Sequence, residues 1–213
     1  MEIFLARTQG FCAGVASAID IVELALKTYG TPLYVYHDIV HNTSVVNDMR
    51  SRGVVFVEDL NNVPEGSRII FSAHGIPPHL IDEARGRKLK YVDATCPLVT
   101  KVHKEAVKFS GQNIDTVLIG HVGHQELVGT AGYVHPDLLH IVENERDVDA
   151  LNIDSGKSVA YITRRPCPSM KPKALSHASN TDSPNSSAPR ARTFAMPPRT
   201  ARTRSKSWPR PAT

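Results

Sequence analysis

The 213-residue sequence has few cysteines, one tryptophan and no long apolar run. Its three cysteines, Cys12, Cys96 and Cys167, are separated by 84 and 71 residues. This odd number and wide spacing do not fit the disulfide framework of a small secreted protein. No apolar stretch approaches the roughly 20 residues that span a bilayer, and no basic start followed by an apolar run indicates a signal peptide. The sequence therefore predicts a cytoplasmic protein with no membrane partner.

Acidic residues are almost absent from the last 50 residues. Residues 164–213 contain 11 Lys and Arg but a single acid, Asp182, whereas residues 1–163 contain 14 Lys and Arg and 20 Asp and Glu. Nine of the 15 prolines also lie in residues 164–213. The net charge of +4 is thus the sum of a mildly acidic body and a basic, proline-rich tail. Because the tail lacks the apolar residues that offset the entropy of ordering a chain, we expect it to be disordered.

The body alternates short apolar runs with segments of helical spacing. The expected strands are 2–6, 33–36, 54–57, 68–71, 90–92, 116–120, 139–142 and 158–162. The expected helices are 13–29, 42–52, 78–88, 97–109, 126–133 and 145–151. This regular alternation predicts an α/β fold with mostly parallel sheets.

Four of these strands are followed by residues that can do chemistry. The segments are R-T-Q-G-F-C-A-G, S-A-H-G, D-A-T-C-P and G-H-V-G-H-Q-E. The carboxyl ends of parallel strands are where α/β folds bind ligands. Cys12 and Cys96 each precede an expected helix, whose N-terminal dipole favours a thiolate that can act as a metal ligand or a nucleophile. Taken singly, each residue also has a plain interpretation, since a lone cysteine is usually a small buried apolar residue.

Five linked motifs in the body resemble the 4-hydroxy-3-methylbut-2-enyl diphosphate reductase family. They are G-F-C-A-G-V near the start, H-D-I-V-H-N-T-S-V-V at 37–46, F-S-A-H-G at 71–75, D-A-T-C-P-L-V-T-K-V-H at 93–103 and I-G-H-V-G-H-Q-E at 119–126. The resemblance implies a trefoil of three α/β domains around a [4Fe–4S] cluster. It also implies reductive removal of the hydroxyl of (E)-4-hydroxy-3-methylbut-2-enyl diphosphate, which gives isopentenyl and dimethylallyl diphosphate in the non-mevalonate isoprenoid pathway.

The resemblance assigns the two body cysteines to the cluster. Cys12 and Cys96 are similar to the first two of the three cysteines that hold it, and the open fourth iron takes the hydroxyl of the substrate in this family. A ferredoxin or flavodoxin type electron donor is implied as the protein partner.

The resemblance also implies roles for three histidines and a glutamate. His41, His74 and His124 are similar to the residues that bind the diphosphate and surround the hydroxyl, and imidazoles can supply the donors that a diphosphate needs. Glu126 is similar to the proton donor, and a glutamate in a dry site can retain its proton until it is transferred. The family commonly has proline before this glutamate, where this sequence has Gln125.

The family pattern stops after Thr163. Where the family is similar to Gln-Thr-Thr-Leu-Ser-Val-Asp-Glu-Thr, this sequence reads Arg-Arg-Pro-Cys-Pro-Ser-Met-Lys-Pro. Reading the possible codons of residues 166–172 from their third base permits Leu-Ser-Val-Asp-Glu-Thr. The same offset at residues 193–197 permits Ile-Cys-Tyr-Ala, which is similar to the surroundings of the third cluster cysteine. We therefore expect residues 164–213 to be an out-of-frame translation, and Cys167 not to be a ligand.

The expected organisation is a first α/β domain at 1–96, an incomplete second domain at 97–163 and a disordered tail at 164–213. One alternative is a non-functional fragment of the reductase that lacks the third cysteine and the third domain. Another is a zinc hydrolase built on His121, His124 and Glu126, although a glycine between the two histidines at a strand end fits zinc poorly. A basic tail can also bind nucleic acid, but the two shifted-frame matches lead us to expect no such partner.

Overall fold

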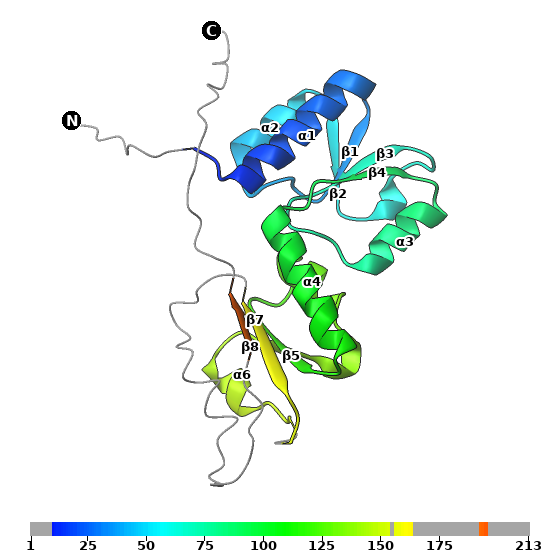
Figure 1. Ribbon diagram of the computed structural model, residues 1–213. Helices are drawn as coiled ribbons and strands as arrows, with labels where there is room; N and C mark the ends of the chain where they lie inside the picture. Colours follow the sequence, from blue (N-terminus) through cyan, green and yellow to red (C-terminus); the bar gives the residue numbers. More distant parts are fainter. Residues whose placement is uncertain (1–9, 154–155, 164–191, 196–213) are drawn as a thin grey trace, which may run out of the picture.

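The structure is a computed structural model that describes residues 10–153, 156–163 and 192–195 (Figure 1). The expected strand at 2–6 and Cys167 lie outside these residues. The described chain contains two four-stranded parallel sheets, each with helices packed on its faces. This confirms the predicted parallel α/β fold class. None of the described helices has the length and apolar content needed to cross a membrane.

The first sheet has the strand order β2-β1-β3-β4. Its strands are β1 (Leu33–Tyr36), β2 (Val54–Val57), β3 (Arg68–Phe71) and β4 (Lys90–Asp93). The helices of this unit are α1 (Ala13–Tyr29), α2 (Thr43–Ser51), α3 (Pro78–Gly86) and the short 3-10 helix η1 (Leu60–Asn62).

The second sheet has the order β6-β5-β7-β8. Its strands are β5 (Asp115–Ile119), β6 (Leu139–Val142), β7 (Val159–Thr163) and β8 (Arg192–Ala195). Its helices are α4 (Pro97–Gly111), α5 (Gln125–Ala131), α6 (Glu145–Asp149) and the 3-10 helix η2 (Pro136–Leu138). The boundary expected between residues 96 and 97 would assign α4 to this unit, where α4 contacts α5, β5 and β7. That division stays a prediction.

Alternation along the strands of the first sheet builds a core on each face. Leu33 and Val35 of β1 lie in one cluster with the buried side of α1 and with Met49 of α2. Tyr36, the neighbour of Val35, lies in the other cluster with Phe71, beneath α3 and η1. Because consecutive side chains of a strand point to opposite faces, a strand covered on both sides is apolar at almost every position. The sequence of β1, L-Y-V-Y, has this composition.

The second sheet is built in the same way. Leu118 of β5 and Ile162 of β7 pack with Phe109 of α4 and with α5. Val117, the neighbour of Leu118, lies in a separate cluster on the other face with Val148 of α6. Each unit therefore has its own apolar core, and each sheet presents the carboxyl ends of its strands to the loops that carry the motifs.

Within the segment expected to be a disordered tail, the structure describes one further strand at Arg192–Ala195. These residues form β8, which pairs in parallel with β7 so that Ile162 lies beside Phe194 and Thr163 beside Ala195. Without β8, the N–H and C=O groups on this side of β7 would be left as an open sheet edge. Pairing such an edge needs only a backbone in extended conformation and side chains that suit a strand, such as those of threonine and phenylalanine.

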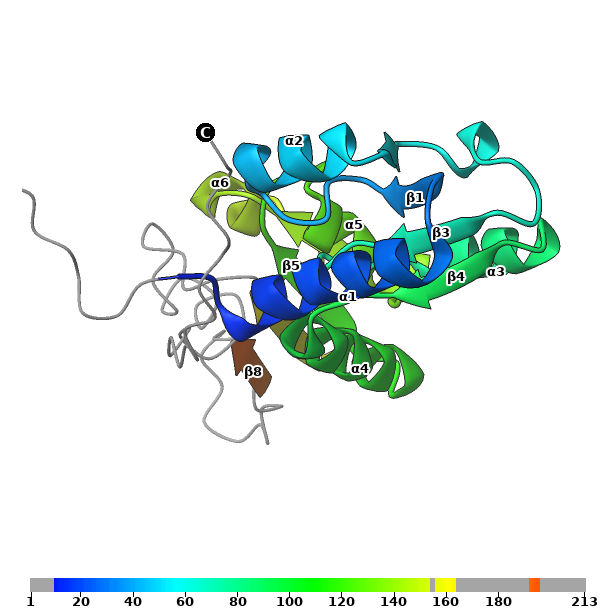
Figure 2. The ribbon, with the colours of Figure 1, turned by 90° about the horizontal axis from the view of Figure 1, so that it is seen from above.

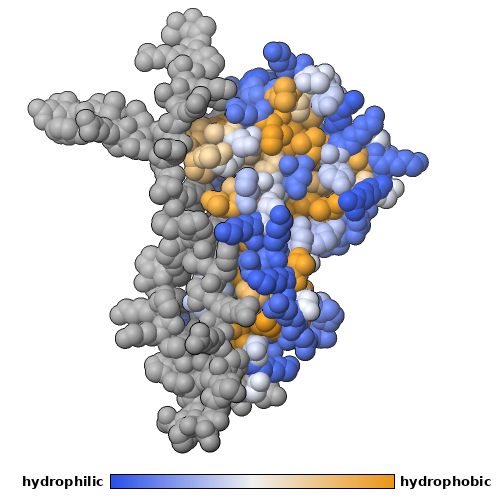
Figure 3. All heavy atoms as spheres, viewed as in Figure 1, coloured by the Kyte–Doolittle hydropathy of each residue, from blue (hydrophilic) through white to orange (hydrophobic). Residues whose placement is uncertain are grey.

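The surface mixes hydrophilic and apolar side chains. On the face seen in Figure 3, hydrophilic residues predominate along the outer edge of the unit that contains α1–α3, and apolar residues gather towards its middle. The apolar side chains that are most exposed in the described residues include Val122, at 67%, and Leu24, at 64%.

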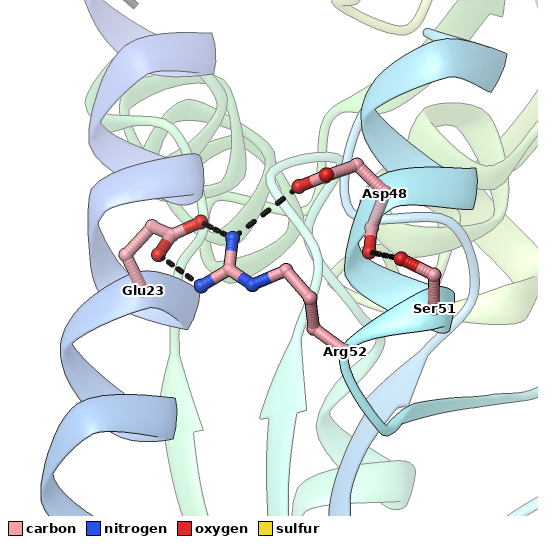
Figure 4. Close-up of polar contacts among 4 residues, drawn as sticks. All are labelled: Glu23, Asp48, Ser51 and Arg52. Carbon is pink, nitrogen blue, oxygen red and sulfur yellow. Dashed lines mark hydrogen bonds and ion pairs between the residues drawn. The ribbon is translucent and has the colours of Figure 1, made fainter. Parts of the chain in front are cut away.

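A bidentate ion pair joins α1 to the end of α2 (Figure 4). Nη1 and Nη2 of Arg52 each donate a hydrogen bond of 2.6 Å to Glu23, and Nη1 also reaches Asp48 at 3.3 Å. The hydrogen bond to Glu23 is the main cause that raises the pKa of Arg52. The Ser51 hydroxyl donates to the Asp48 carbonyl at 2.7 Å. All these groups lie at the surface, where water and salt screen the attraction.

We predict that the apolar core, and not this ion pair, determines the stability of the first unit. Met49→Ala removes a side chain with 0% exposure and should cost about 2–5 kcal/mol of unfolding free energy. Glu23→Gln should cost at most about 1 kcal/mol, and less at high salt. Urea unfolding followed by circular dichroism measures both. A loss for Glu23→Gln as large as that for Met49→Ala would contradict the prediction.

Candidate functional site

Three of the predicted histidines lie together. The ring centroids are 4.2 Å apart for His41 and His74, 5.4 Å for His41 and His124, and 6.3 Å for His74 and His124. His41 comes from the segment after β1, His74 from the segment after β3, and His124 from the segment after β5. His74 is buried and His41 is exposed. Three loops of two different sheets therefore meet to form one imidazole cluster.

Backbone hydrogen bonds fix the loops of the first sheet relative to one another. The Ala73 N–H donates to the Ile39 carbonyl at 3.4 Å, and the Cys96 N–H donates to the Ala73 carbonyl at 3.0 Å. These bonds extend the pairing of β1, β3 and β4 beyond the last residue of each strand. The segments that carry His41, His74 and Cys96 are thus held side by side.

The two body cysteines lie at neighbouring helix ends. Cys12 is the N-cap residue of α1 and Cys96 is the N-cap residue of α4, and both are free and half-buried. A Cβ on Gly14 would lie 2.5 Å from Sγ of Cys96, so this sulfur lies against the first turn of α1. Figures 1 and 2 both show the N-termini of α1 and α4 next to each other. The predicted placement of both cysteines at helix starts is confirmed.

The two thiols are suitable ligands for iron or another soft metal, but they are only part of a site. Across the described residues, no group of three or more His, Cys, Asp or Glu side chains is arranged to hold a metal ion. A three-cysteine cluster site would therefore need a ligand from outside this set.

His124 and Glu126 share the first turn of α5. His124 is the N-cap residue, and its Nδ1 accepts a hydrogen bond of 3.1 Å from the Glu126 N–H. In the neutral ring this bond assigns the proton to Nε2. Glu126 borders a cavity of about 30 Å³ whose other walls include Leu118 and Ile162. A cavity of that size is large enough to hold a water molecule.

Glu143 fixes the loop that leads to His124. Its Oε1 accepts a hydrogen bond of 2.6 Å from the Val122 N–H and lies 3.5 Å from Nδ1 of His121. The His121 side chain is 87% exposed. His121 is thus paired with Glu143, and the zinc alternative built on His121, His124 and Glu126 gains no support from this part of the chain.

A fourth histidine, His103, was not predicted to belong to the site. It is 6% exposed, its ring stacks on Tyr133 with centroids 4.3 Å apart, and its Nε2 has no hydrogen-bond partner among the described residues. Burial lowers the pKa of His103 to about 4, and the negative charge of Asp93 opposes this only in part. The helical spacing of α4 is a signal that could have found it, since His103 follows Val99 by four residues on the buried side.

The comparisons with known proteins match one family. The sequence profile of the LytB protein family matches residues 3–186. A 4-hydroxy-3-methylbut-2-enyl diphosphate reductase from Psychrobacter arcticus is 52% identical over 167 residues, which cover 77% of this chain and 52% of that protein. One from Rhodopirellula baltica is 50% identical over 164 residues. The chain spans about half the length of the curated relatives it matches.

Two solved structures have the same fold. The structure of E-1-hydroxy-2-methyl-but-2-enyl-4-diphosphate reductase from Plasmodium falciparum matches with a TM-score of 0.75 and 42% identity, over 81% of this chain and 54% of that one. A structure of (E)-4-hydroxy-3-methyl-but-2-enyl diphosphate reductase matches with a TM-score of 0.65 and 30% identity, over 82% of this chain and 61% of that one.

We predict that His103 makes the protein less stable in mild acid. Its folded pKa of about 4 lies below the usual value of 6.5, so the unfolded chain gains a proton before the folded chain does. Stability should therefore be unaffected above pH 6.5 and fall by on the order of 3 kcal/mol between pH 6.5 and pH 4. Urea unfolding at several pH values measures this. His103→Leu should remove this part of the slope and the exposed control His121→Gln should keep it; equal slopes in all three proteins would refute the assignment.

Proposed function

The chain belongs to the LytB protein family, and on this premise we propose that it carries the first half of a 4-hydroxy-3-methylbut-2-enyl diphosphate reductase. The proposed reaction is the reductive dehydroxylation of (E)-4-hydroxy-3-methylbut-2-enyl diphosphate to isopentenyl and dimethylallyl diphosphate. It consumes two electrons and two protons and releases water. The observation that carries the proposal is the meeting of three imidazoles at the carboxyl ends of the strands, with Cys96 joined to the segment of His74 and packed against the first turn of α1.

The imidazole cluster is the proposed diphosphate site. Rings 4.2–6.3 Å apart can contact the oxygens of one diphosphate together. Two of the rings also stand just before helices, His41 before α2 and His124 before α5. The N–H groups and positive dipole at a helix start favour an anion. No arginine is needed where several imidazole and backbone N–H groups can donate to one anion.

Cys12 and Cys96 are the proposed ligands of a [4Fe–4S] cluster. Their thiols suit iron, and both residues stand at the N-caps of neighbouring helices. When bound, the cluster would supply electrons and a Lewis-acidic iron for the substrate hydroxyl. Gly14 contributes by having no Cβ, which leaves the space that Sγ of Cys96 occupies. We propose a ferredoxin or flavodoxin type protein as the source of the electrons.

Glu126 is the proposed proton donor. It lies in the first turn of α5, two residues after His124, and borders a cavity of about 30 Å³ with mostly apolar walls. A carboxyl group in such a place can deliver a proton to a ligand held by the neighbouring imidazoles.

The third cluster ligand is proposed to be encoded but not read. If one base is restored after Thr163, the Ile-Cys-Tyr-Ala sequence falls on positions 194–197 and the cysteine replaces Ala195. The pairing of Ala195 with Thr163 supports this reading, because it puts position 195 at the carboxyl end of the second sheet. The alternative remains that the chain as it stands is a non-functional fragment of the reductase, with two cluster cysteines in place of three.

We predict that the 213-residue chain binds inorganic pyrophosphate through the imidazole cluster. His41→Gln and His74→Gln should each weaken binding by about tenfold, which corresponds to loss of one charge-assisted hydrogen bond. His79→Gln is the matched control, because His79 is an exposed histidine on α3. Titration calorimetry measures the affinities. If His79→Gln weakens binding as much as His41→Gln, the cluster is not the anion site.

We also predict that restoring the frame restores the cluster. A gene with one base added at the codon after Thr163 should encode a chain that takes up an oxygen-sensitive iron–sulfur cluster under anaerobic reconstitution, whereas the 213-residue chain should retain little iron. In the repaired protein, Cys12→Ser should lower the iron content. Glu126→Gln should leave the iron content unchanged and cut turnover by about 10²–10⁴-fold, because only proton delivery is lost.

Iron and sulfide content, measured beside the reductase rate, tests both parts of this prediction. Near-normal turnover of Glu126→Gln would show that another group donates the proton. Stable cluster in the 213-residue chain that disappears with Cys167→Ser would refute the out-of-frame reading.

A further inference from the structure

The backbone of α5 lies directly against the loop that carries His74. A Cβ on Gly129 would lie 3.0 Å from the carbonyl oxygen of Gly75 and 3.2 Å from its carbonyl carbon. A Cβ on Gly132, at the end of α5, would lie 2.3 Å from Cβ of Pro77. Distances this short occur only because both positions are glycine. Two glycines three residues apart therefore bring a helix of the second unit into contact with a loop of the first.

The opposite side of the same loop is packed just as closely. Gly75 has φ of +79°, and a Cβ there would lie 2.5 Å from Cε1 of His103 and 3.0 Å from Val99. The His103 ring in turn stacks on Tyr133, which follows α5. The loop is thus held between the backbone of α5 and the buried ring of His103 on α4. His103 and Tyr133 lie with α4 and α5 in the second unit, so both sides of the loop pack against that unit.

The groups joined by this contact are those of the proposed site. His74 immediately precedes Gly75, while His124 caps α5 and Glu126 lies in its first turn. The centroid distance of 6.3 Å between His74 and His124 is therefore set by how closely α5 approaches the loop. A methyl group on Gly129 would meet the Gly75 carbonyl, so the helix or the loop would have to shift by a few tenths of an ångström.

Helix propensity alone does not explain these glycines. Glycine inside a helix is less favourable than alanine by about 1 kcal/mol. The helical glycines Gly86 in α3 and Gly111 in α4 have nothing within 4 Å of a built Cβ, so alanine would be tolerated there. At Gly129 and Gly132 the same replacement meets atoms of the other unit.

We propose that Gly129 and Gly132 are positioning residues, which fix the spacing between His74 on one unit and His124 and Glu126 on the other. That His74 and His124 bind a diphosphate rests on the proposed function, whereas the distance between their rings does not.

The test compares Gly129→Ala with Gly111→Ala in the 213-residue protein. The Cε1–H resonances of His74 and His124 report the surroundings of the two rings, and single His→Gln variants assign them. Gly129→Ala should shift both resonances and weaken binding of inorganic pyrophosphate by about tenfold or more. Gly111→Ala should leave the resonances and the affinity unchanged. Val148→Ala, in the core beneath the second sheet, controls for lost stability: it should lower the melting temperature without moving the two resonances.

A folded Gly129→Ala protein with unchanged His74 and His124 resonances would overturn the proposal. If the wild-type protein does not bind pyrophosphate, the proposed diphosphate site fails, and the resonances still decide the spacing. If Gly129→Ala does not fold, Gly132→Ala decides, together with Gly132→Ala/Pro77→Gly, which removes the nearest atom that the new methyl group meets, Cβ of Pro77. The proposal requires the His74 and His124 resonances of the double variant to lie closer to their wild-type positions than those of Gly132→Ala. If they lie no closer, the proposal is refuted.

Discussion

The site depends on the buried backbone of the segment from Ser72 to Pro77. All six residues are buried, so their peptide groups need partners within the protein. Ala73 donates to Ile39 and accepts from Cys96. The carbonyl of Gly75 meets α5 at the position where Gly129 has no side chain. One short segment therefore ties together the loops after β1 and β4 and a helix of the other unit.

This constraint explains why two separate cores can form one site. Each sheet has its own apolar clusters on both faces, so each unit has the packing of an ordinary α/β layer structure. The first unit supplies His41, His74 and Cys96, and the second supplies His124 and Glu126. Neither set is sufficient to surround a small anion. The proposed chemistry should therefore be more sensitive to the relative position of the units than to the stability of either one.

Sequence patterns were sufficient to predict the helices and strands but not the contacts between them. β1 and β2 were predicted at their observed bounds because short apolar runs ended by glycine, histidine or acid are strongly typical of buried strands. Asn42 was expected to cap α2 and does so by accepting a hydrogen bond from Val45. Gly129 gave no such signal, because a glycine inside a helix pattern looks unfavourable until its neighbour across the interface is known. For His103 the spacing in α4 indicated the buried side, but its contacts with Gly75 and Tyr133 are tertiary and could not be read from the sequence.

In the tail, a strand and a metal ligand place different requirements on the sequence. β8 pairs with β7 through backbone groups, which are the same in any reading frame, and its four residues need only suit a strand. A shifted frame can therefore leave the fourth strand of the second sheet in place. A cluster ligand, by contrast, needs one sulfur at one position, and the frame that reads Ala195 removes it. If residues 164–213 are out of frame, as proposed, the chain keeps most of the scaffold of the second unit and loses the thiolate. The shift of reading frame would then abolish the proposed chemistry without abolishing the fold of the second unit.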